Sequence, residues 1–407
     1  MYKKFNNATL HGIAISAGLG VFFVSLSKLI LFADFLIFMF FVKRKINIKC
    51  TLNLAPRSLV VLVVACLWMT LSCLWTDATD AEVQKALIRH LRLLLVVFVF
   101  CLIDSRDQAI SILKWLCIVQ VITVFLSWLM FMGIYFPFEQ TNQSKQLAVP
   151  FTSTLEQPVM TTLALAVIVF LRADWVKYTF KPVLVFVMFL CVANVVVVMS
   201  GRTGYIALFT LFFLTACLNK FKNKLAFFIV VLLSIPVLFF NSPRFHDKTQ
   251  EIYEGVQKYS SGSVDSSEGQ RLEYWEKSIK SMSERPFFGS GVGSWRNEYY
   301  RLNGVQINPP TNPHNQFLLW GVEAGAVGLF LIILFILSLI EDARKRLDKP
   351  ESGALISITV LAVVVGVFNC PFYGAGMGEF FMVLFGSLLA MGKFSEANKT
   401  ELIRQVH

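Results

Sequence analysis

The chain has 407 residues, of which 56% are hydrophobic and only 15% are charged. Because soluble globular proteins carry about 25% charged residues, this composition excludes an ordinary water-soluble protein. The formal net charge of +11 could suit a nucleic-acid-binding protein, but in a membrane chain we attribute it to topology and expect no nucleic-acid partner.

Apolar runs recur along the chain from Leu10 to Gly392. They lack the two-residue alternation of an outer-membrane barrel, so they predict an all-α polytopic membrane protein with about twelve transmembrane helices. The first runs continue to Val42 with no small-residue cleavage site, so we expect them to be mature structure, not a signal peptide. The expected spans lie near residues 10–27, 29–42, 57–75, 84–103, 110–133, 157–172, 182–199, 203–218, 225–240, 315–340, 354–370 and 375–392.

The charges of the connecting loops predict the orientation of these spans. Short cytoplasmic loops collect Lys and Arg, whereas the opposite loops here hold Asp77, Asp80 and Glu82 and one long polar segment. We therefore expect transmembrane helices in 1–240, a long outer loop in 241–313, further transmembrane helices in 314–392 and a cytoplasmic tail in 393–407, with both termini cytoplasmic. The basic loops contain Lys43, Arg44, Lys45 and Lys49, then Arg172, Lys177 and Lys181, then Lys220, Lys222 and Lys224, and finally Arg344, Lys345, Arg346 and Lys349.

Three basic residues share one face of the fourth expected span. Lys85, Arg89 and Arg92 are spaced i, i+4 and i+7, and His90 lies beside them. By the predicted topology they enter from the outer side and run one or two turns into the bilayer. A charge near the bilayer centre costs roughly 2.5–3.5 kcal/mol on insertion scales. The stripe therefore indicates either an aqueous cavity that holds an anion or side chains that snorkel to the interface.

Arg202 lies in Ser200-Gly201-Arg202-Thr203-Gly204, an expected tight outer turn between two apolar helices. It could be an interfacial anchor. It could equally form an anion site, because backbone N–H groups at a helix start and a bidentate guanidinium both bind phosphate oxygens. The flanking glycines would then let a bulky ligand approach the backbone.

The long loop carries nine basic and nine acidic residues, a balance that indicates a small folded element and not an anchor for anionic lipid. Arg271 begins an expected amphipathic helix, where it could be a solvated charge or a functional group. Three glycines after Pro286 form a loop, and no strand precedes it as a dinucleotide fingerprint would require. The helix is predicted from about Gln270 to Ser283 by the spacing of Leu272, Trp275, Ile279 and Met282.

His314 lies in Asn312-Pro313-His314-Asn315-Gln316, where the long polar loop meets an apolar helix. An imidazole titrates near neutral pH, so it could accept a proton from a sugar hydroxyl. Asn312 or Asn315 could cap the helix or orient the site. The alternative is a histidine that only caps the helix or lies at the interface. The eight cysteines show no metal-ligand spacing, so we expect neither a metal nor a cofactor.

These residues resemble motifs of one family. His314-Asn315 is followed after nine residues by Gly325-Ala326-Val327-Gly328, which resembles the HN-x9-GxxG pattern of the O-antigen ligase and polymerase superfamily. Three further features agree in order: Ser-Gly-Arg202 at an outer turn, Arg271 with Trp275, and the glycine-rich segment 286–293 before the histidine. Ile206 stands where the ligase motif often has Leu, a mild departure.

The resemblance implies a glycosyltransferase-C-like enzyme that needs no metal or nucleotide. It implies transfer of O-antigen from an undecaprenyl-diphosphate carrier to lipid A–core at the periplasmic face of a Gram-negative inner membrane, among inner membrane lipids. By this resemblance, Arg202 and Arg271 would bind the diphosphate, and His314 would activate or position the acceptor hydroxyl. Gly325 and Gly328 would be a structural motif. Further candidate site residues are Lys85, Arg89, Arg92, Arg296 and Asn315.

Three alternatives remain open. An O-antigen polymerase of the same superfamily would join repeat units on the carrier, but polymerases often carry basic residues in two outer loops. A protein O-oligosaccharyltransferase usually has a longer C-terminal region. A transporter or flippase for lipid-linked glycans belongs to another class and tends to show internal repeats and charges at the midplane. The polar residues here gather at one face, which favours catalysis.

Overall fold

The computed structural model describes Gly12 and residues 55–136, 147–151, 153–177, 179–199, 201–218, 243–303 and 310–406. The described residues form helices and connecting turns without any strand, which confirms the predicted all-α class. The expected spans near 10–27, 29–42 and 225–240 lie outside the described residues, as do the basic loops at 43–49 and 220–224.

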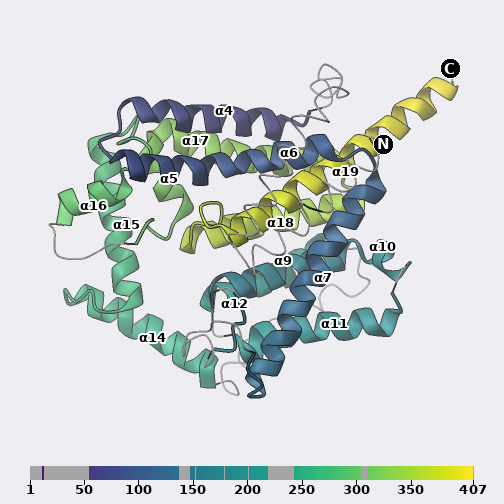
Figure 1. Ribbon diagram of the computed structural model, residues 1–407, viewed down its shortest axis with the longest axis horizontal. Coiled ribbons are helices and arrows are strands. Elements are labelled where there is room, and N and C mark those ends of the chain that lie inside the picture. The colour runs from purple at the N-terminus through teal and green to yellow at the C-terminus, as the bar shows by residue number, and fades with distance from the viewer. Residues whose placement is uncertain are drawn as a thin grey trace.

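The helices are named in chain order (Figure 1). They are α4 (Arg57–Leu71), α5 (Asp80–Leu91), α6 (Leu95–Leu102), α7 (Arg106–Phe131), α9 (Glu156–Phe170), α10 (Arg172–Val176), α11 (Lys181–Ala193), α12 (Arg202–Leu218), α14 (Pro243–Ser260), α15 (Ser267–Glu284), α16 (Trp295–Asn303), α17 (Gln316–Arg344), α18 (Pro350–Phe368) and α19 (Gly376–Val406). Short 3-10 turns at Ser72–Leu74 and Arg92–Leu94 extend α4 and join α5 to α6, and a π-helical turn at Asn194–Val198 ends α11.

Six helices in the described part of the chain are long and apolar enough to cross a membrane, and α9 and α12 are shorter apolar helices. The six are Arg57–Leu74, Arg106–Phe131, Lys181–Val198, Gln316–Arg344, Pro350–Phe368 and Gly376–Phe394. The expected span at 84–103 is instead divided between α5 and α6. A capping box of Thr79 and Glu82 fixes where α5 begins, and the 3-10 turn at Arg92–Leu94 separates α5 from α6.

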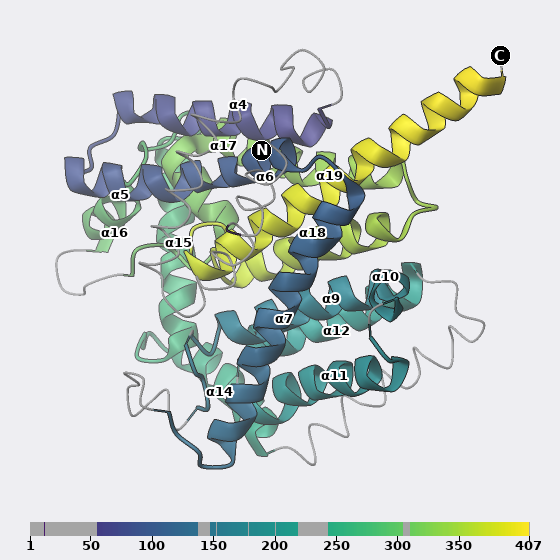
Figure 2. The ribbon, with the colours of Figure 1, turned by 45° about the vertical axis from the view of Figure 1, so that its right-hand side comes forward.

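The helices of the bundle pack around α19, which contacts α6, α7, α9 and α18. The apolar part of α19 is 89% buried within the protein, so it forms the centre of the fold. α17 packs on α4 and α18, α19 packs on α6 and α7, and α12 packs on α9 and α18. α14, α15 and α16 gather at one end of this bundle, on the left of Figure 1 and at the same end in Figure 2.

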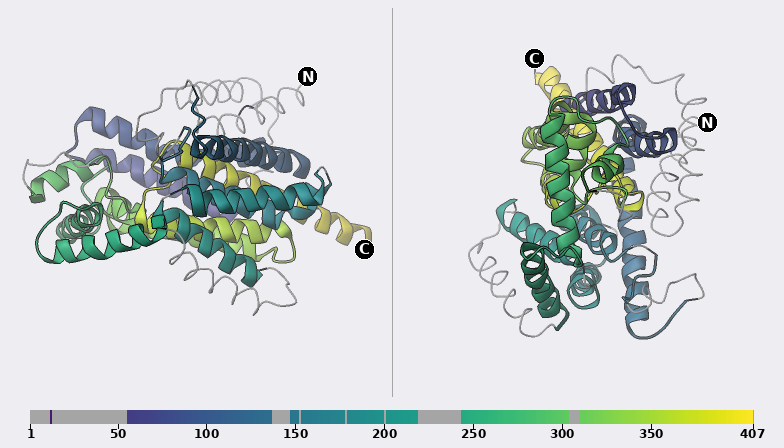
Figure 3. Two further views of the ribbon diagram at one scale, coloured as in Figure 1. Left: turned by 90° about the horizontal axis from the view of Figure 1, so that it is seen from below. Right: turned by 90° about the vertical axis from the view of Figure 1, so that its left-hand side faces the viewer.

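The two ends of the bundle differ in charge. The right-hand view of Figure 3 looks onto the end that carries α15, and this helix, drawn in green, runs across it. The opposite end gathers the basic residues of the α4 start and the α17 end, including Arg57, Lys345 and Arg346, together with Lys393. The loop charges predict that these two ends lie on opposite sides of the membrane. Which compartment each end faces stays a prediction.

A glycine-rich segment fixes the end of the bundle that carries α15. Gly325 adopts φ 65° and ψ −165° and interrupts α17. Segment 286–293 fills this break: Ser290 N donates to Val322 O at 2.8 Å, and Ala326 N donates to Pro286 O at 2.8 Å. The backbone groups that the break frees are therefore satisfied by another segment, as buried polar groups require.

Candidate active site

His314 lies in a strained turn directly before α17. Its φ is 52°, a left-handed conformation that is uncommon for residues other than glycine. The turn is held by Asn312, whose Oδ1 accepts from His314 N at 2.9 Å. Asn315 then caps α17, because its Oδ1 accepts from Phe317 N and Leu318 N at 3.0 Å each. Asn315 therefore positions the turn, and its amide is occupied by backbone contacts.

The imidazole of His314 is half-buried beside a cation. Burial and the charge of Arg271 lower its pKa, while a hydrogen bond with Asn369 acts in the opposite direction. The ring lies parallel to Tyr274, with centroids 6.5 Å apart. Its Nδ1 is buried and has no hydrogen-bond partner among the described residues. This arrangement favours a neutral imidazole with one nitrogen available to accept a proton.

Arg202 and Arg271 line the same cavity, of about 220 Å³. Arg202 is the first residue of α12, and Arg271 lies in the second turn of α15. Burial and the charge of Arg202 lower the pKa of Arg271. Arg202 forms ion pairs with Glu251 and Glu268, whereas Arg271 makes no ion pair with any residue that the structure describes. An unpaired, half-buried guanidinium beside a second one suits an anionic ligand.

Apart from Thr203 and from Glu268, which pairs with Arg202, the rest of this cavity is apolar. Ile206, Ile252, Val256, Leu272, Trp275 and Phe368 contribute to its wall, with Trp275 and Phe368 rings 6.4 Å apart. Two cations at one side of an apolar wall suit a ligand that joins a charged group to a hydrocarbon chain.

The glycines around Arg202 serve packing and not ligand approach. A Cβ added at Gly201 would collide with the carbonyl oxygen of Thr154, and one at Gly204 would collide with Pro158. The start of α9 therefore occupies the space that the sequence suggested for a ligand. Ser200 lies outside the described residues.

The buried face of α15 agrees only in part with the one that its apolar spacing predicts, because Trp275 and Met282 pack against the core but Ile279 does not. Ile279 is 58% exposed, although it was expected on the buried face. Tyr274 is buried instead and contacts Trp295 and Tyr299, with centroids 5.7 and 5.4 Å away. The reason is that aromatic side chains of α16 cover the face that holds Tyr274, and Ser278 Oγ on that face accepts from Trp295 Nε1 at 3.0 Å. Arg271 is thereby turned toward α12.

A second basic cavity, of about 360 Å³, opens at the same end of the bundle. Lys85 and Arg89 line it together with Arg296 from α16. The guanidinium carbon of Arg89 lies 4.7 Å from the ring centroid of Tyr373. Arg92 points elsewhere, donating to Gly374 O at 2.7 Å and lying 3.6 Å from Glu379. The predicted stripe is thus divided, and two of its members face a cavity with a third cation from the long loop.

A buried carboxylate also reaches this second cavity. Glu323 is 1% exposed, and its Oε2 lies 2.7 Å from Nε2 of His90, which is 2% exposed. Its other oxygen accepts from Gly293 N at 3.1 Å. Glu323 is not among the residues predicted from the sequence. It is the only charged residue in the expected span 315–340, and an acidic residue in an apolar span indicates function or a buried partner.

Gly325 and Gly328 have structural roles. A Cβ at Gly325 would collide with the carbonyl oxygen of Phe287, and one at Gly328 would collide with Ala324. The first glycine admits segment 286–293 into the break in α17, and the second allows the helix to resume beyond it. Within the described residues no group of three or more His, Cys, Asp or Glu side chains could hold a metal ion.

The comparison with known families agrees with the motifs. Residues 184–333 match a family model described as O-antigen ligase. This region begins in α11, ends in α17 and contains Arg202, Arg271 and His314. No curated protein matches the chain. The match confirms the resemblance to the O-antigen ligase superfamily that the motifs indicated.

Proposed function

We propose that this chain, whose residues 184–333 carry an O-antigen ligase family domain, is a metal-independent glycosyltransferase of bacterial surface-polysaccharide synthesis. It would transfer O-antigen from undecaprenyl diphosphate to lipid A–core at the periplasmic face of the inner membrane. Its end with α14–α16 would then face the periplasm.

The observation that carries this proposal is the grouping of Arg202, Arg271 and His314. The two arginines share one cavity, and Arg271 is close enough to His314 to lower the pKa of its imidazole. A carrier diphosphate at the arginines would thus lie beside the proposed base. Nothing else in the described residues combines cations, an apolar wall and an available imidazole.

The proposed step is a direct displacement. The acceptor hydroxyl oxygen forms a bond to the anomeric carbon of the donor, while the bond from that carbon to the diphosphate oxygen breaks. The hydroxyl proton passes to His314, and the leaving diphosphate keeps the electron pair. Arg202 and Arg271 would stabilise the charge that develops on the diphosphate, which cations do best where water is scarce. His314 then returns the proton to solvent.

Donor binding would require exchange of partners at Arg202. Glu251 and Glu268 pair with this guanidinium, so a diphosphate must replace one or both carboxylates. Exchange of one anion for another keeps the guanidinium paired throughout, which avoids the cost of leaving a partly buried charge alone. Arg271, which has no such partner among the described residues, would make the first contact.

The second basic cavity fits the acceptor. Lys85, Arg89 and Arg296 would hold anionic groups of lipid A–core while its sugar hydroxyl reaches His314. The same cavity also supports a second candidate function, an O-antigen polymerase, in which these cations would hold the diphosphate of a second carrier lipid. The two cavities together would then bind two lipid-linked substrates.

Deletion of the gene separates these functions through two products, the glycan on lipid A–core and the glycan on the carrier. Loss of a ligase leaves long polymer on the carrier and bare core. Loss of a polymerase leaves core capped by a single repeat unit. Loss of a flippase leaves carrier-linked units at the cytoplasmic face. Bare core with carrier-linked polymer is the expected result, and normal capped core would contradict the proposal.

A further inference from the structure

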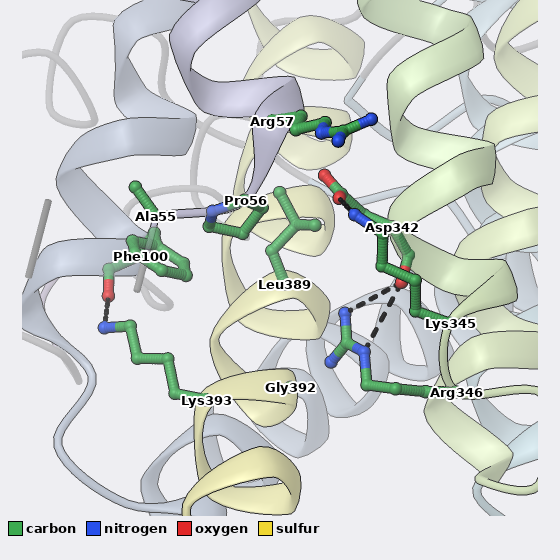
Figure 4. Close-up of a pocket in the computed structure, with 10 residues that line it drawn as sticks. All are labelled: Ala55, Pro56, Arg57, Phe100, Asp342, Lys345, Arg346, Leu389, Gly392 and Lys393. Carbon is green, nitrogen blue, oxygen red and sulfur yellow. Dashed lines mark hydrogen bonds and ion pairs between the residues drawn. The ribbon is translucent and has the colours of Figure 1, made fainter. Parts of the chain in front are cut away.

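A third cavity lies at the end of the bundle opposite the candidate active site (Figure 4). Its volume is about 270 Å³, and its wall comes from the start of α4, the end of α6, the end of α17 and α19. Four basic residues line it, namely Arg57, Lys345, Arg346 and Lys393, against one acidic residue, Asp342. The proposed transfer reaction uses none of these groups.

Arg346 is the central cation of this cavity. Its side chain is only 8% exposed, and its Nε and Nη2 donate to the carbonyl oxygen of Asp342 at 3.4 and 3.3 Å. Its Nη1 is buried and has no hydrogen-bond partner among the described residues. The guanidinium lies against Gly392, where a Cβ would collide with it. A buried charged donor that lacks an acceptor is costly unless a ligand supplies one.

The acidic groups nearby are already occupied. Asp342 accepts from Ser58 N at 3.0 Å and from Lys345 Nζ at 3.2 Å. Glu341, just outside the cavity, pairs with Arg57 at 2.8 Å. Lys393 enters from the other side, where its ammonium donates to carbonyl oxygens at the end of α6. Asp104 also acts electrostatically on Lys393. Four cations against these three carboxylates leave the cavity with a surplus of positive charge.

The wall of the cavity is also partly apolar. Phe100, Leu389, Ala55 and Pro56 line it beside the cations. From Arg57 a strip of exposed apolar residues runs along α4 at helical spacing: Val60, Val64, Leu67 and Leu71, exposed by 57, 45, 63 and 45%. A ligand that combines an anionic head with hydrocarbon chains would contact both the cations and the apolar strip, whereas a free anion would contact only the cations.

We infer that this cavity binds the phosphate of an anionic phospholipid, with the guanidinium of Arg346 as the principal donor. The acyl chains would lie along the exposed strip of α4. Basic pockets between transmembrane helices recognise lipid head groups in this way. Because the cavity and the candidate active site lie at opposite ends of the helices, this lipid would belong to the leaflet opposite the one in which transfer takes place.

The test measures how much phosphatidylglycerol the intact chain retains. The protein is reconstituted in an equal mixture of phosphatidylglycerol and phosphatidylcholine, extracted in mild detergent, and analysed by native mass spectrometry. Arg346→Gln should lower phosphatidylglycerol retention about tenfold, as expected when a charge-assisted hydrogen bond is lost. Arg344→Gln is the matched control, because this exposed arginine ends α17 two positions before Arg346 and does not line the cavity, and retention should not change.

Two results would contradict the inference. The first is equal phosphatidylglycerol retention in Arg346→Gln and Arg344→Gln. The second is binding of inorganic phosphate that depends on Arg346 without any preference for phosphatidylglycerol, which would identify a soluble anion as the ligand. If Arg346→Gln does not fold, Arg57→Gln decides, because the Arg57 side chain is 72% exposed and its loss leaves the packing intact. Arg57→Gln should weaken retention several-fold, and unchanged retention would overturn the inference.

Discussion

At the scale of single residues, the protonation state of the His314 imidazole depends on its neighbours. Its pKa is lowered first by burial and then by the charge of Arg271. Both effects destabilise the imidazolium, so the neutral base is present at pH values where an ordinary histidine, with a pKa of about 6.5, would begin to be protonated. A base that is neutral at the working pH can accept the proton of the acceptor hydroxyl.

The pH dependence of kcat/KM tests this electrostatic relation. The acid limb should lie below pH 6.5 in the wild type, because activity is lost only as the pH falls through the lowered pKa of His314. Arg271→Gln removes the repulsive charge, so the limb should move to higher pH in addition to any loss of rate. Lys280→Gln, a change of the same kind on the exposed face of α15, should leave the limb in place. A limb that stays unchanged in Arg271→Gln would show that this charge does not act on the base.

At the scale of elements, the break in α17 connects the glycine motif to the site. Segment 286–293 fills the break through backbone hydrogen bonds, and α17 begins at the Asn315 cap directly after His314. The sequence pattern identified Gly325 and Gly328 as a motif without explaining them. The physical reason for Gly325 became visible only in the contact with Phe287, 38 positions earlier in the chain, which no local pattern encodes.

Gly325→Ala should destabilise the fold and abolish transfer. The left-handed backbone alone costs about 1–3 kcal/mol for a residue with a side chain, and the Cβ would also collide with the carbonyl oxygen of Phe287. The measurement is the thermal unfolding midpoint in detergent, together with the transfer rate. Gly133→Ala is the control, because Gly133 has φ 88° with open space around it and isolates the backbone cost. Equal midpoints for the two variants would mean that the contact with segment 286–293 contributes nothing.

The helices also show which structural features a sequence pattern can predict and which it cannot. The helices of the described region lie close to the predicted spans because length and hydrophobicity act locally along the chain. The face of α15 was predicted wrongly for Ile279, because its partners come from α16 and aromatic residues there select Tyr274. Lys85 and Arg89 face a cavity shared with Arg296, whereas Arg92 lies beside Glu379. Both partners lie far away in sequence, so the i, i+4, i+7 spacing could not predict that the three basic residues separate.

At the scale of the whole molecule, the separation of the two ends organises the proposed function. Arg202, Arg271 and His314 come from α12, α15 and the start of α17, and only the folded bundle places them at one end. The order of the motifs identified these residues, but their mutual contacts could not be predicted, because the apolar spacing of the long loop predicts a helix there but does not say which other helices it packs against. The opposite end holds Arg346 and its cavity.

The sidedness of the molecule can be measured by cysteine labelling in spheroplasts. The eight native cysteines are first replaced by serine or alanine. Single cysteines are then introduced as Arg285→Cys, at the end with α15, and Lys349→Cys, after α17, both at exposed positions. A membrane-impermeant maleimide should label the first and not the second, because the basic end is expected in the cytoplasm. Labelling of both in lysed membranes shows that each thiol is accessible. The reverse pattern in spheroplasts would place the candidate active site in the cytoplasm.

The most direct measurement of the central claim is transfer by the purified chain. Undecaprenyl-diphosphate-linked O-antigen and lipid A–core are supplied in detergent, and formation of glycosylated lipid A–core is followed together with release of undecaprenyl diphosphate. The wild type and Lys280→Gln should form both products at similar rates. His314→Ala should lose at least about 100-fold of the rate, as expected for loss of a general base. Arg202→Gln should lose about 100-fold or more through the leaving diphosphate. Full transfer by His314→Ala and Arg202→Gln would contradict the account.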